Sequence, residues 1–201
     1  VVIDMSTISP QGARDINESL NSKSSYFIDA PVSGGEAGAI SGELSIMVGG
    51  DKKIYQKIKY VLSALGKKIT YIGDSGSGQV CKACNQILVA QTIQSISEII
   101  TIAKKSNIDP LLIREALLAG YANSKILDIH GLRMITSDFS PGFKLSLHHK
   151  DLKIGKNLTQ QLGISIKGLN NVKKLMKLGE NENLSDLDSS AIHKVLEKIH
   201  N

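Results

Sequence analysis

One stretch of the sequence, residues 73–86, limits the possible folds most, because a turn rich in Gly and Ser runs directly into a long apolar helix. Before this stretch, short apolar runs alternate with amphipathic helical segments, and after it the hydrophobic period is helical. We therefore expect an α/β region at residues 1–73, followed by an all-α region at residues 74–201 built around one long central helix.

In the first region, four apolar runs predict buried strands over residues 1–5, 26–30, 43–48 and 68–72. Helices are expected between them, one starting at Pro10 after the N-cap Ser9 and one starting after the N-cap Asp51. A strand, a helix and a strand in this length predict a right-handed parallel crossover. The region is thus expected to be the C-terminal part of a Rossmann-type parallel sheet.

In the second region, helices are expected over residues 80–105, 110–119, 124–135, 144–162, 166–178 and 185–199, the last of them capped by Ser185. The helix at residues 80–105 is apolar nearly all round, which is typical of a helix buried at the centre of a protein. We also expect it to pack against a partner subunit, as a homodimer or a homotetramer.

The first strand begins at Val1, and a parallel sheet of only these four strands would leave an apolar edge bare. The three-glycine fingerprint of dinucleotide-binding domains is missing, because Gly76-Ser77-Gly78 lacks the third glycine and leads into the all-α region. We expect a cofactor-binding half to precede Val1. If the protein instead begins there, it is a truncated paralogue that acts as a non-catalytic oligomerisation or interaction module.

Composition narrows the classes of ligand. The net charge of +5 comes from scattered lysines without a long basic block, and aromatic residues make up only 4% of the chain. This favours small anionic ligands and argues against nucleic acid. No apolar run approaches the roughly 20 residues that a membrane span needs, so no membrane partner is expected. Without a signal peptide, a reducing, cytoplasmic location is the default expectation.

Cys81 and Cys84 form a Cys-x-x-Cys pair, which is compatible with a redox dithiol or with half of a zinc site. There is no second cysteine pair, and the histidines lie far away in the sequence. Both cysteines also fall inside a helix that needs apolar side chains. We therefore expect buried thiols and no metal site.

Two features indicate chemistry. Lys82 and Asn85 are three residues apart near the start of the long helix, so they share one helical face where the N-terminus favours anions. A lysine there suits proton transfer at a carbonyl oxygen, although a solvated lysine near a helix end is the plainer interpretation. Ser33, Gly34 and Gly35 follow a strand, where their N–H groups can cradle a carboxylate, or form only a turn.

Four motifs occur in the order seen in β-hydroxyacid dehydrogenases. They are Asp-Met-Ser-Thr-Ile-Ser-Pro at residues 4–10, Asp-Ala-Pro-Val-Ser-Gly-Gly at 29–35, Gly-Ser-Gly-Gln-Val-Cys-Lys-Ala-Cys-Asn at 76–85, and Lys-Asp-Leu at 150–152. The sequence therefore resembles that family across almost all of its length. Within the family it looks most like 3-hydroxyisobutyrate dehydrogenase and 2-hydroxy-3-oxopropionate (tartronate semialdehyde) reductase.

The resemblance implies an enzyme that uses NAD or NADP to interconvert a short 3-hydroxy carboxylic acid and its semialdehyde. A relative acting on glyoxylate or succinic semialdehyde stays an alternative, and the choice between NAD and NADP stays open. By position, the resemblance gives these roles: Lys82 as general acid/base, Asn85 beside the substrate, Ser33, Gly34 and Gly35 on the substrate carboxylate, and Thr7 and Lys150 on the cofactor. Some members carry an asparagine where this chain has Gln86, so the division of work between Asn85 and Gln86 also stays open.

Overall fold

The computed structural model describes residues 1–200. The chain divides into two compact units, one formed by Val1–Asn85 with Asn157–Gly163, the other by Gln86–Lys156 with the residues from Ile164 onward. The helix α4 (Ser77–Lys105) begins in the first unit and continues into the second. The division expected at residues 73 and 74 stays a prediction.

The first unit contains a five-stranded sheet with the order β1-β2-β4-β3 and with β5 paired to β4. Its strands are β1 (Val2–Asp4), β2 (Phe27–Asp29), β3 (Val32–Ser33), β4 (Ser45–Gly50) and β5 (Lys68–Gly73). The expected crossover is confirmed, since β1 and β2 are parallel with Val2 opposite Phe27. The four expected strands are all present.

The sheet is mixed, whereas the sequence predicts a parallel one. Strand β4 runs parallel to β5 but antiparallel to both β2 and β3. The reason lies in residues 31–44, which form β3 and the short helix α2 (Gly35–Ile40) and so return the chain to the opposite direction before β4. No helix or strand was expected at residues 31–42.

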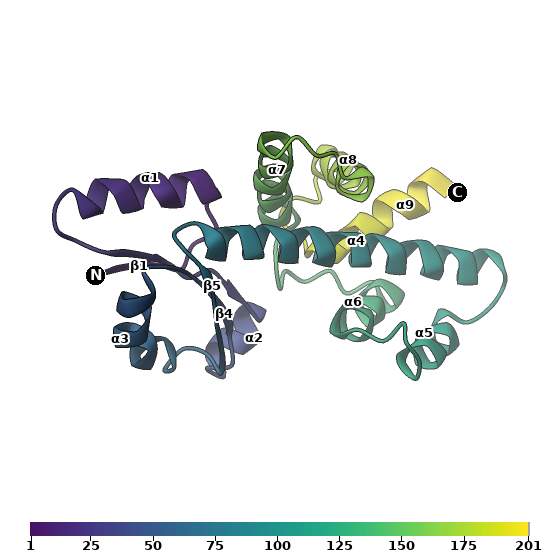
Figure 1. Cartoon of the computed structure of the whole chain (residues 1–201). Coiled ribbons are helices and arrows are strands. Elements are labelled where there is room, and N and C mark those ends of the chain that lie inside the picture. Colours follow the sequence, from purple (N-terminus) through teal and green to yellow (C-terminus); the bar gives the residue numbers. More distant parts are fainter. Residues whose placement is uncertain (201) are drawn as a thin grey trace. The chain divides into compact units, whose positions relative to one another are not determined.

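Two longer helices cover the sheet. Figure 1 shows α1 (Pro10–Asn21) above the strands and α3 (Lys52–Leu62) below them. Both expected N-caps are confirmed, because Ser9 Oγ accepts from Gly12 N at 3.0 Å and Asp51 Oδ1 accepts from Lys53 N at 2.8 Å. The apolar core between α3 and the sheet includes Ile28, Ile46, Val48, Ile54 and Leu62.

Strand β1 is less buried than expected. Val2 is exposed and Ile3 is only partly buried. Among residues 1–200, β1 pairs with β2 alone, so its second edge has no neighbouring strand there. The prediction of a buried first strand is therefore wrong for this structure.

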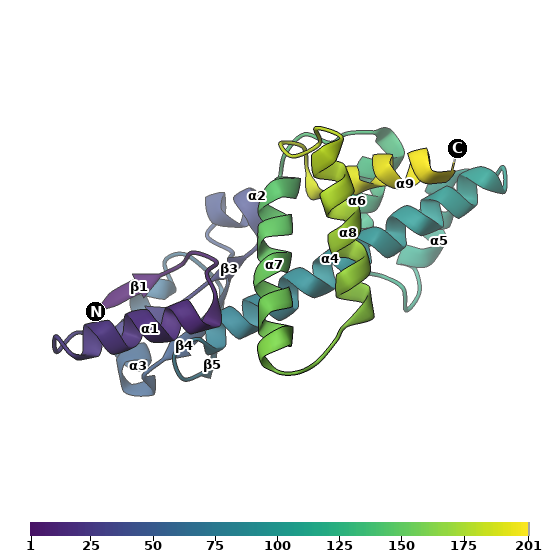
Figure 2. The same cartoon turned by 90° about the horizontal axis from the view of Figure 1, so that it is seen from above.

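The second unit is helical. Besides the later part of α4 it contains α5 (Pro110–Leu118), α6 (Lys125–Thr136), the part of α7 (Leu145–Gln161) up to Lys156, α8 (Lys167–Asn181) and α9 (Ile192–His200), the last preceded by the 3₁₀ turn η1 (Ser189–Ala191). Figure 2 shows α7 and α8 side by side. A common core joins these helices to α4 through Ile93, Ile96, Leu152, Met176 and Ile192. An α/β region followed by an all-α region is the fold class that the sequence predicts.

Helix α4 is not buried on all sides. Ile93 and Ile96 are buried, but Leu88 is 66% exposed and Ile102 is 64% exposed. By length and composition alone, α4 could cross a membrane. This finding corrects the expectation that no apolar run is long enough for a membrane span. A core helix passes the same test, and 39% of its most apolar window is buried inside the protein. The apolar character of α4 is therefore partly accounted for by the core of the second unit.

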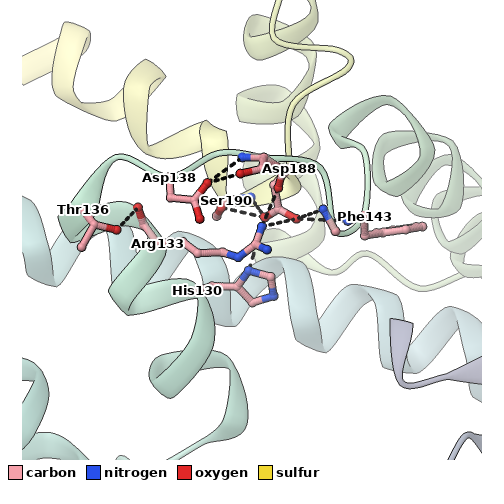
Figure 3. A network of polar contacts seen from close by, with 9 residues as sticks. His130, Arg133, Thr136, Asp138, Phe143, Asp188 and Ser190 are labelled. Carbon is pink, nitrogen blue, oxygen red and sulfur yellow. Dashed lines mark hydrogen bonds and ion pairs between the residues drawn. The ribbon is translucent and has the colours of Figure 1, made fainter. Parts of the chain in front are cut away.

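The last helix starts differently from the prediction, because Ser185 is not its N-cap. Instead the buried Asp188 caps η1, with Oδ1 accepting from Ser190 N at 3.0 Å. Its other oxygen accepts from Phe143 N at 3.1 Å and lies 3.3 Å from Arg133 Nη1. Figure 3 shows how this one carboxylate joins the segment at residues 138–143 to η1. The cap itself is local, since Ser190 is two residues from Asp188, whereas Phe143 and Arg133 lie more than 40 residues earlier in the chain.

These contacts set the charge state of Asp188. Burial raises the pKa of its carboxyl group, but hydrogen bonds from His130, from Ser190 and from the N–H of Phe143 outweigh burial. The pKa therefore lies well below the ordinary value, and the carboxylate is charged at neutral pH.

Candidate active site

Lys82 lies in the second turn of α4 and is only 8% exposed. A lysine is almost never so buried unless its ammonium group has a role or a partner. Asn85 follows one turn later on the same helical face and is half-buried. The plainer interpretation of Lys82, a solvated surface lysine, is thus wrong for this structure.

The start of α4 is fixed to the sheet by Asp29, the last residue of β2. Asp29 Oδ1 accepts from Gly76 N at 2.8 Å and Oδ2 accepts from Gln79 N at 3.0 Å. These N–H groups belong to the first turn of the helix, which has no partners of its own for them. The carboxylate therefore acts as a helix cap contributed by a strand about 50 residues earlier.

Asp29 is fully buried among these donors. Burial raises the pKa of its carboxyl group, and the N–H groups of Gly76 and Gln79 oppose that rise. Asp29 belongs to one of the family motifs, but the sequence alone indicates no role for it. Its position at the end of an apolar strand, where a charge is costly, was the available signal.

The two glycines before Lys82 are explained by close packing. A Cβ atom at Gly78 would lie 2.4 Å from Met47 O and 2.8 Å from Asp29 Oδ2. Gly76 has a φ of +86°, in the left-handed region that favours glycine. The Gly-x-Gly of this chain thus lets the first turn of α4 approach β2 and β4 closely.

Ser33, Gly34 and Gly35 lie where β3 ends and α2 begins. Ser33 ends β3, opposite Ser45 of β4. Gly34 has a φ of +138° and Gly35 a φ of +64°, which explains why two glycines occur in succession. Both glycines are exposed, so an anion can reach the backbone here without a side chain in the way.

Thr7 lies in the loop between β1 and α1 and is half-buried. Because β1 and β2 are parallel and adjacent, this loop and the segment after Asp29 leave the sheet at the same edge. In open α/β sheets, ligands bind outside the carboxyl ends of the strands. The first unit thus contains the Thr7 loop, the Ser33–Gly35 segment and the anchored start of the helix that carries Lys82.

Lys150 lies on α7 in the second unit and is exposed. Its Nζ is 3.3 Å from Oδ1 of the buried neighbour Asp151. The other oxygen of Asp151 accepts from Gln86 Nε2 at 2.7 Å. The Gln86 side chain therefore serves a buried contact within the second unit, which favours Asn85 as the substrate neighbour.

The polar run at residues 148–151 is more buried than a polar helix face would be. His148, His149 and Asp151 are all buried, and His149 Nδ1 lies 2.8 Å from Glu180 Oε1. Burial lowers the pKa of His149, although Glu180 opposes that shift. Residues 1–200 hold no cluster of three or more potential metal ligands among His, Cys, Asp and Glu.

The prediction of two buried thiols is wrong for Cys84, which is exposed, while Cys81 is partly buried. The two cysteines are not joined in a disulfide. Burial and the neighbouring Cys84 both raise the pKa of the Cys81 thiol. Near Cys84 one side of helix α4 therefore faces solvent, although the sequence of the helix is apolar there.

Comparison with known families identifies both regions. The family model for the NAD-binding domain of NADP-dependent 3-hydroxyisobutyrate dehydrogenase matches residues 76–196, which is more than half of the chain. The chain belongs to the β-hydroxyacid dehydrogenase family. A second model, the NAD-binding domain of 6-phosphogluconate dehydrogenase, matches residues 1–73.

Individual relatives agree with this assignment. The 2-hydroxy-3-oxopropionate reductase of Escherichia coli strain K12 is 42% identical over 200 residues, which cover 100% of this chain and 68% of the relative. A probable mitochondrial 3-hydroxyisobutyrate dehydrogenase-like protein of Arabidopsis thaliana is 36% identical over 201 residues, covering 100% of this chain and 60% of the relative. The chain thus spans between 60% and 68% of the length of these two relatives.

Among solved structures, 3-hydroxyisobutyrate dehydrogenase of Mycobacterium tuberculosis, determined with L-serine, has a TM-score of 0.89 and 29% sequence identity. The match covers 96% of this chain and 69% of that chain. The family, the fold class and the expectation of NAD or NADP as cofactor are thereby confirmed. The roles of individual site residues stay predictions.

Proposed function

We propose that the protein containing this chain is an NAD(P)-dependent oxidoreductase that interconverts a short 3-hydroxy carboxylic acid and its semialdehyde. The observation that carries the proposal is the buried Lys82 on a helix whose start is bonded to Asp29, at the sheet edge from which the Ser33–Gly35 segment leaves. Relatives named as a 2-hydroxy-3-oxopropionate reductase and as 3-hydroxyisobutyrate dehydrogenases support the substrate class.

In this proposal Lys82 Nζ exchanges a proton with the reacting oxygen of the substrate. It takes the proton of the hydroxyl group during oxidation and returns one to the developing alkoxide during reduction. Burial keeps water from competing for that oxygen, and the fixed helix start holds the lysine in place. Asn85, one turn further along, donates from its side-chain amide to the substrate.

The N–H groups of Ser33, Gly34 and Gly35 would hold the substrate carboxylate. Backbone donors suit this task because they are rigid and strengthen when their acceptor is charged. The positive φ values of both glycines keep the segment in a conformation that other residues rarely adopt.

Thr7 and Lys150 are the candidate contacts of the cofactor. Thr7 lies in the loop after a parallel strand, the position where sheets of this kind bind ligands. The family resemblance gives Thr7 and Lys150 the role of cofactor contacts. When bound, the nicotinamide accepts or supplies the hydride, and the protein provides orientation and charge.

We also propose that the protein is a homodimer or a homotetramer. In this proposal the exposed apolar side chains of Leu88 and Ile102 on α4 face the partner subunit. A monomeric mass in solution would refute it.

The test is an activity assay on the protein expressed from its complete coding sequence. We expect turnover of 3-hydroxyisobutyrate or tartronate semialdehyde with NAD or NADP, and lower rates with glyoxylate or succinic semialdehyde. Lys82→Ala should lower kcat by roughly 10² to 10⁴, the range for removal of a general acid or base, with little change in cofactor affinity.

The matched control is Lys105→Ala, which removes an exposed lysine from the far end of the same helix. It should leave kcat unchanged. A Lys82→Ala protein with more than a tenth of the normal rate would exclude Lys82 from the proposed role.

A further inference from the structure

Gln79 links the start of α4 to the loop that contains Thr7. It is the third residue of α4 and its side chain is buried. Gln79 Nε2 donates to Ser6 O at 2.8 Å, and Ile8 N donates to Gln79 Oε1 at 3.2 Å. One side chain thus forms two hydrogen bonds to a segment more than 70 residues earlier in the chain.

The two bonds fix the loop on either side of Thr7. A carboxamide that accepts from one backbone N–H and donates to a backbone C=O two residues earlier imitates a neighbouring strand. Because a backbone N–H can only donate and a carbonyl can only accept, the orientation of the amide is determined by its partners. The peptide groups before and after Thr7 are held together, and this restricts the direction in which the Thr7 side chain points.

The backbone of Gln79 is fixed independently of its side chain. Its N–H donates to Asp29 Oδ2 at 3.0 Å, so the residue is tied to the end of β2. Lys82 follows three residues later, one turn along the same helix. Gln79 therefore lies where the Thr7 loop, the motif beginning at Asp29 and the helix bearing Lys82 meet.

We propose that Gln79 is a positioning residue for the cofactor: its side-chain amide holds the Thr7 loop in register with the start of the helix that carries Lys82. The inference rests on the proposed function, in which Thr7 contacts the cofactor. The anchoring of α4 itself depends on Asp29 and on the close approach at Gly78, neither of which needs the Gln79 side chain. Removal of the amide should therefore loosen the loop and leave the helix in place.

Only glutamine can both accept from Ile8 N and donate to Ser6 O at this position. Asparagine is one methylene shorter and would not span the two bonds, each already near the normal length. Glutamate has nearly the same shape but is an acceptor only when ionised, so it would face Ser6 O without a proton between them. Methionine fills a similar volume and forms neither bond.

The test compares Gln79→Met and Gln79→Glu with wild type, in the protein expressed from its complete coding sequence. We expect the Kd for NAD or NADP to rise about tenfold in both variants, the change that corresponds to losing one or two hydrogen bonds. At saturating cofactor, kcat and the KM for the hydroxy acid should stay within about twofold of wild type. The reason is that the whole loss is expected in the Kd for the cofactor. A split of this kind separates cofactor positioning from a general structural defect.

Gln94→Met and Gln94→Glu are the matched controls. Gln94 lies on the same helix, and its amide donates to Glu98 Oε1 within one turn of that helix. Both control variants should bind cofactor as wild type does. If Gln79→Met proves unstable, Gln79→Glu keeps the shape of the side chain and still removes the donor to Ser6.

Exchange of the Ile8 amide hydrogen provides a direct measure of the loop, and we expect it to accelerate in the Gln79 variants relative to the Gln94 controls. An unchanged Kd in both Gln79 variants, with a wild-type protein that binds cofactor and turns over, would overturn the positioning role alone. A wild-type protein that binds neither NAD nor NADP would overturn the proposed function, and this inference with it.

Discussion

Substitution of Gly78 by alanine should separate the start of α4 from the sheet. The new Cβ would lie 2.4 Å from Met47 O and 2.8 Å from Asp29 Oδ2. Normal carbon–oxygen contacts are about 3.3 Å or longer, so the helix start or β4 must retreat by about 1 Å. Met47 O is a backbone atom in a central strand and cannot turn away as a side chain could.

The cost follows from three contributions. Overpacking costs about 1–3 kcal/mol, and weakening the charged hydrogen bonds of Asp29 costs about 1.5–3 kcal/mol. The better helix propensity of alanine returns up to about 1 kcal/mol. The net loss of unfolding free energy is then about 1.5–6 kcal/mol, or roughly 3–24 °C in Tm for a chain of this size.

The same retreat should lower activity, since Lys82 lies one turn beyond Gly78 on α4. A displacement of about 1 Å in a catalytic group can reduce the rate about 10²-fold. Urea and thermal unfolding measure the stability, and steady-state kinetics measure kcat. Gly120→Ala is the control, because a Cβ there meets no atom within 4 Å, and its effect should stay within about 0.5 kcal/mol. A Gly78→Ala protein as stable and as active as this control would refute the reasoning.

Two further predictions concern the second unit and the cysteines. Since the pKa of folded Asp188 lies below its ordinary value, the stability that Asp188 contributes is present above about pH 4 and is lost as the pH falls toward the folded pKa. Asp188→Asn should thus cost about 2–4 kcal/mol near pH 7 and less at about pH 3, where the loss of this stability has begun but is not complete; an equal loss at both pH values in urea unfolding would contradict the network. A thiol reagent should label the exposed Cys84 before Cys81, because burial raises the pKa of the Cys81 thiol. Mass spectrometry of the labelled peptides measures the order, and labelling of Cys81 first would contradict the exposure of Cys84.

Local signals in the sequence were sufficient for most of the secondary structure. Ser9, Asp51 and Asp109 are followed by helices that begin where caps predict, and each side chain accepts from a backbone N–H in the first turn. The turn before residue 77 and the long helix after it were also predicted correctly. These features depend on neighbours within a few residues, which a sequence displays directly.

Features that depend on distant residues were missed. The direction of β4 follows from β3 and α2, whose short segments carry no strong periodic pattern. The cap that Asp29 provides for α4 joins residues 47 and 50 positions apart, and the contact between Gln86 and Asp151 spans 65. No spacing rule connects residues so far apart.

In the candidate site, too, local features were predicted and features that depend on distant residues were missed. Lys82 and Asn85 could be proposed from one helical stretch and a family resemblance, but the burial of Lys82 became evident only from the fold. The exposure of Cys84, two residues after Lys82, was wrongly predicted because the apolar helix pattern does not say which side faces the core. Gln79 was quoted in a motif without a role, since its partners Ser6 and Ile8 are reached only in the folded chain.

The central claim, proton transfer by Lys82 in an NAD(P)-dependent reaction, is tested most directly by a single-turnover measurement. Wild type and Lys82→Ala, each saturated with reduced nicotinamide cofactor, are mixed with a saturating short semialdehyde acid, and the nicotinamide absorbance is followed. We predict that wild type oxidises one equivalent of cofactor rapidly and that Lys82→Ala is slower by roughly 10² to 10⁴. No absorbance change in wild type, or a Lys82→Ala rate within about tenfold of it, would contradict the account.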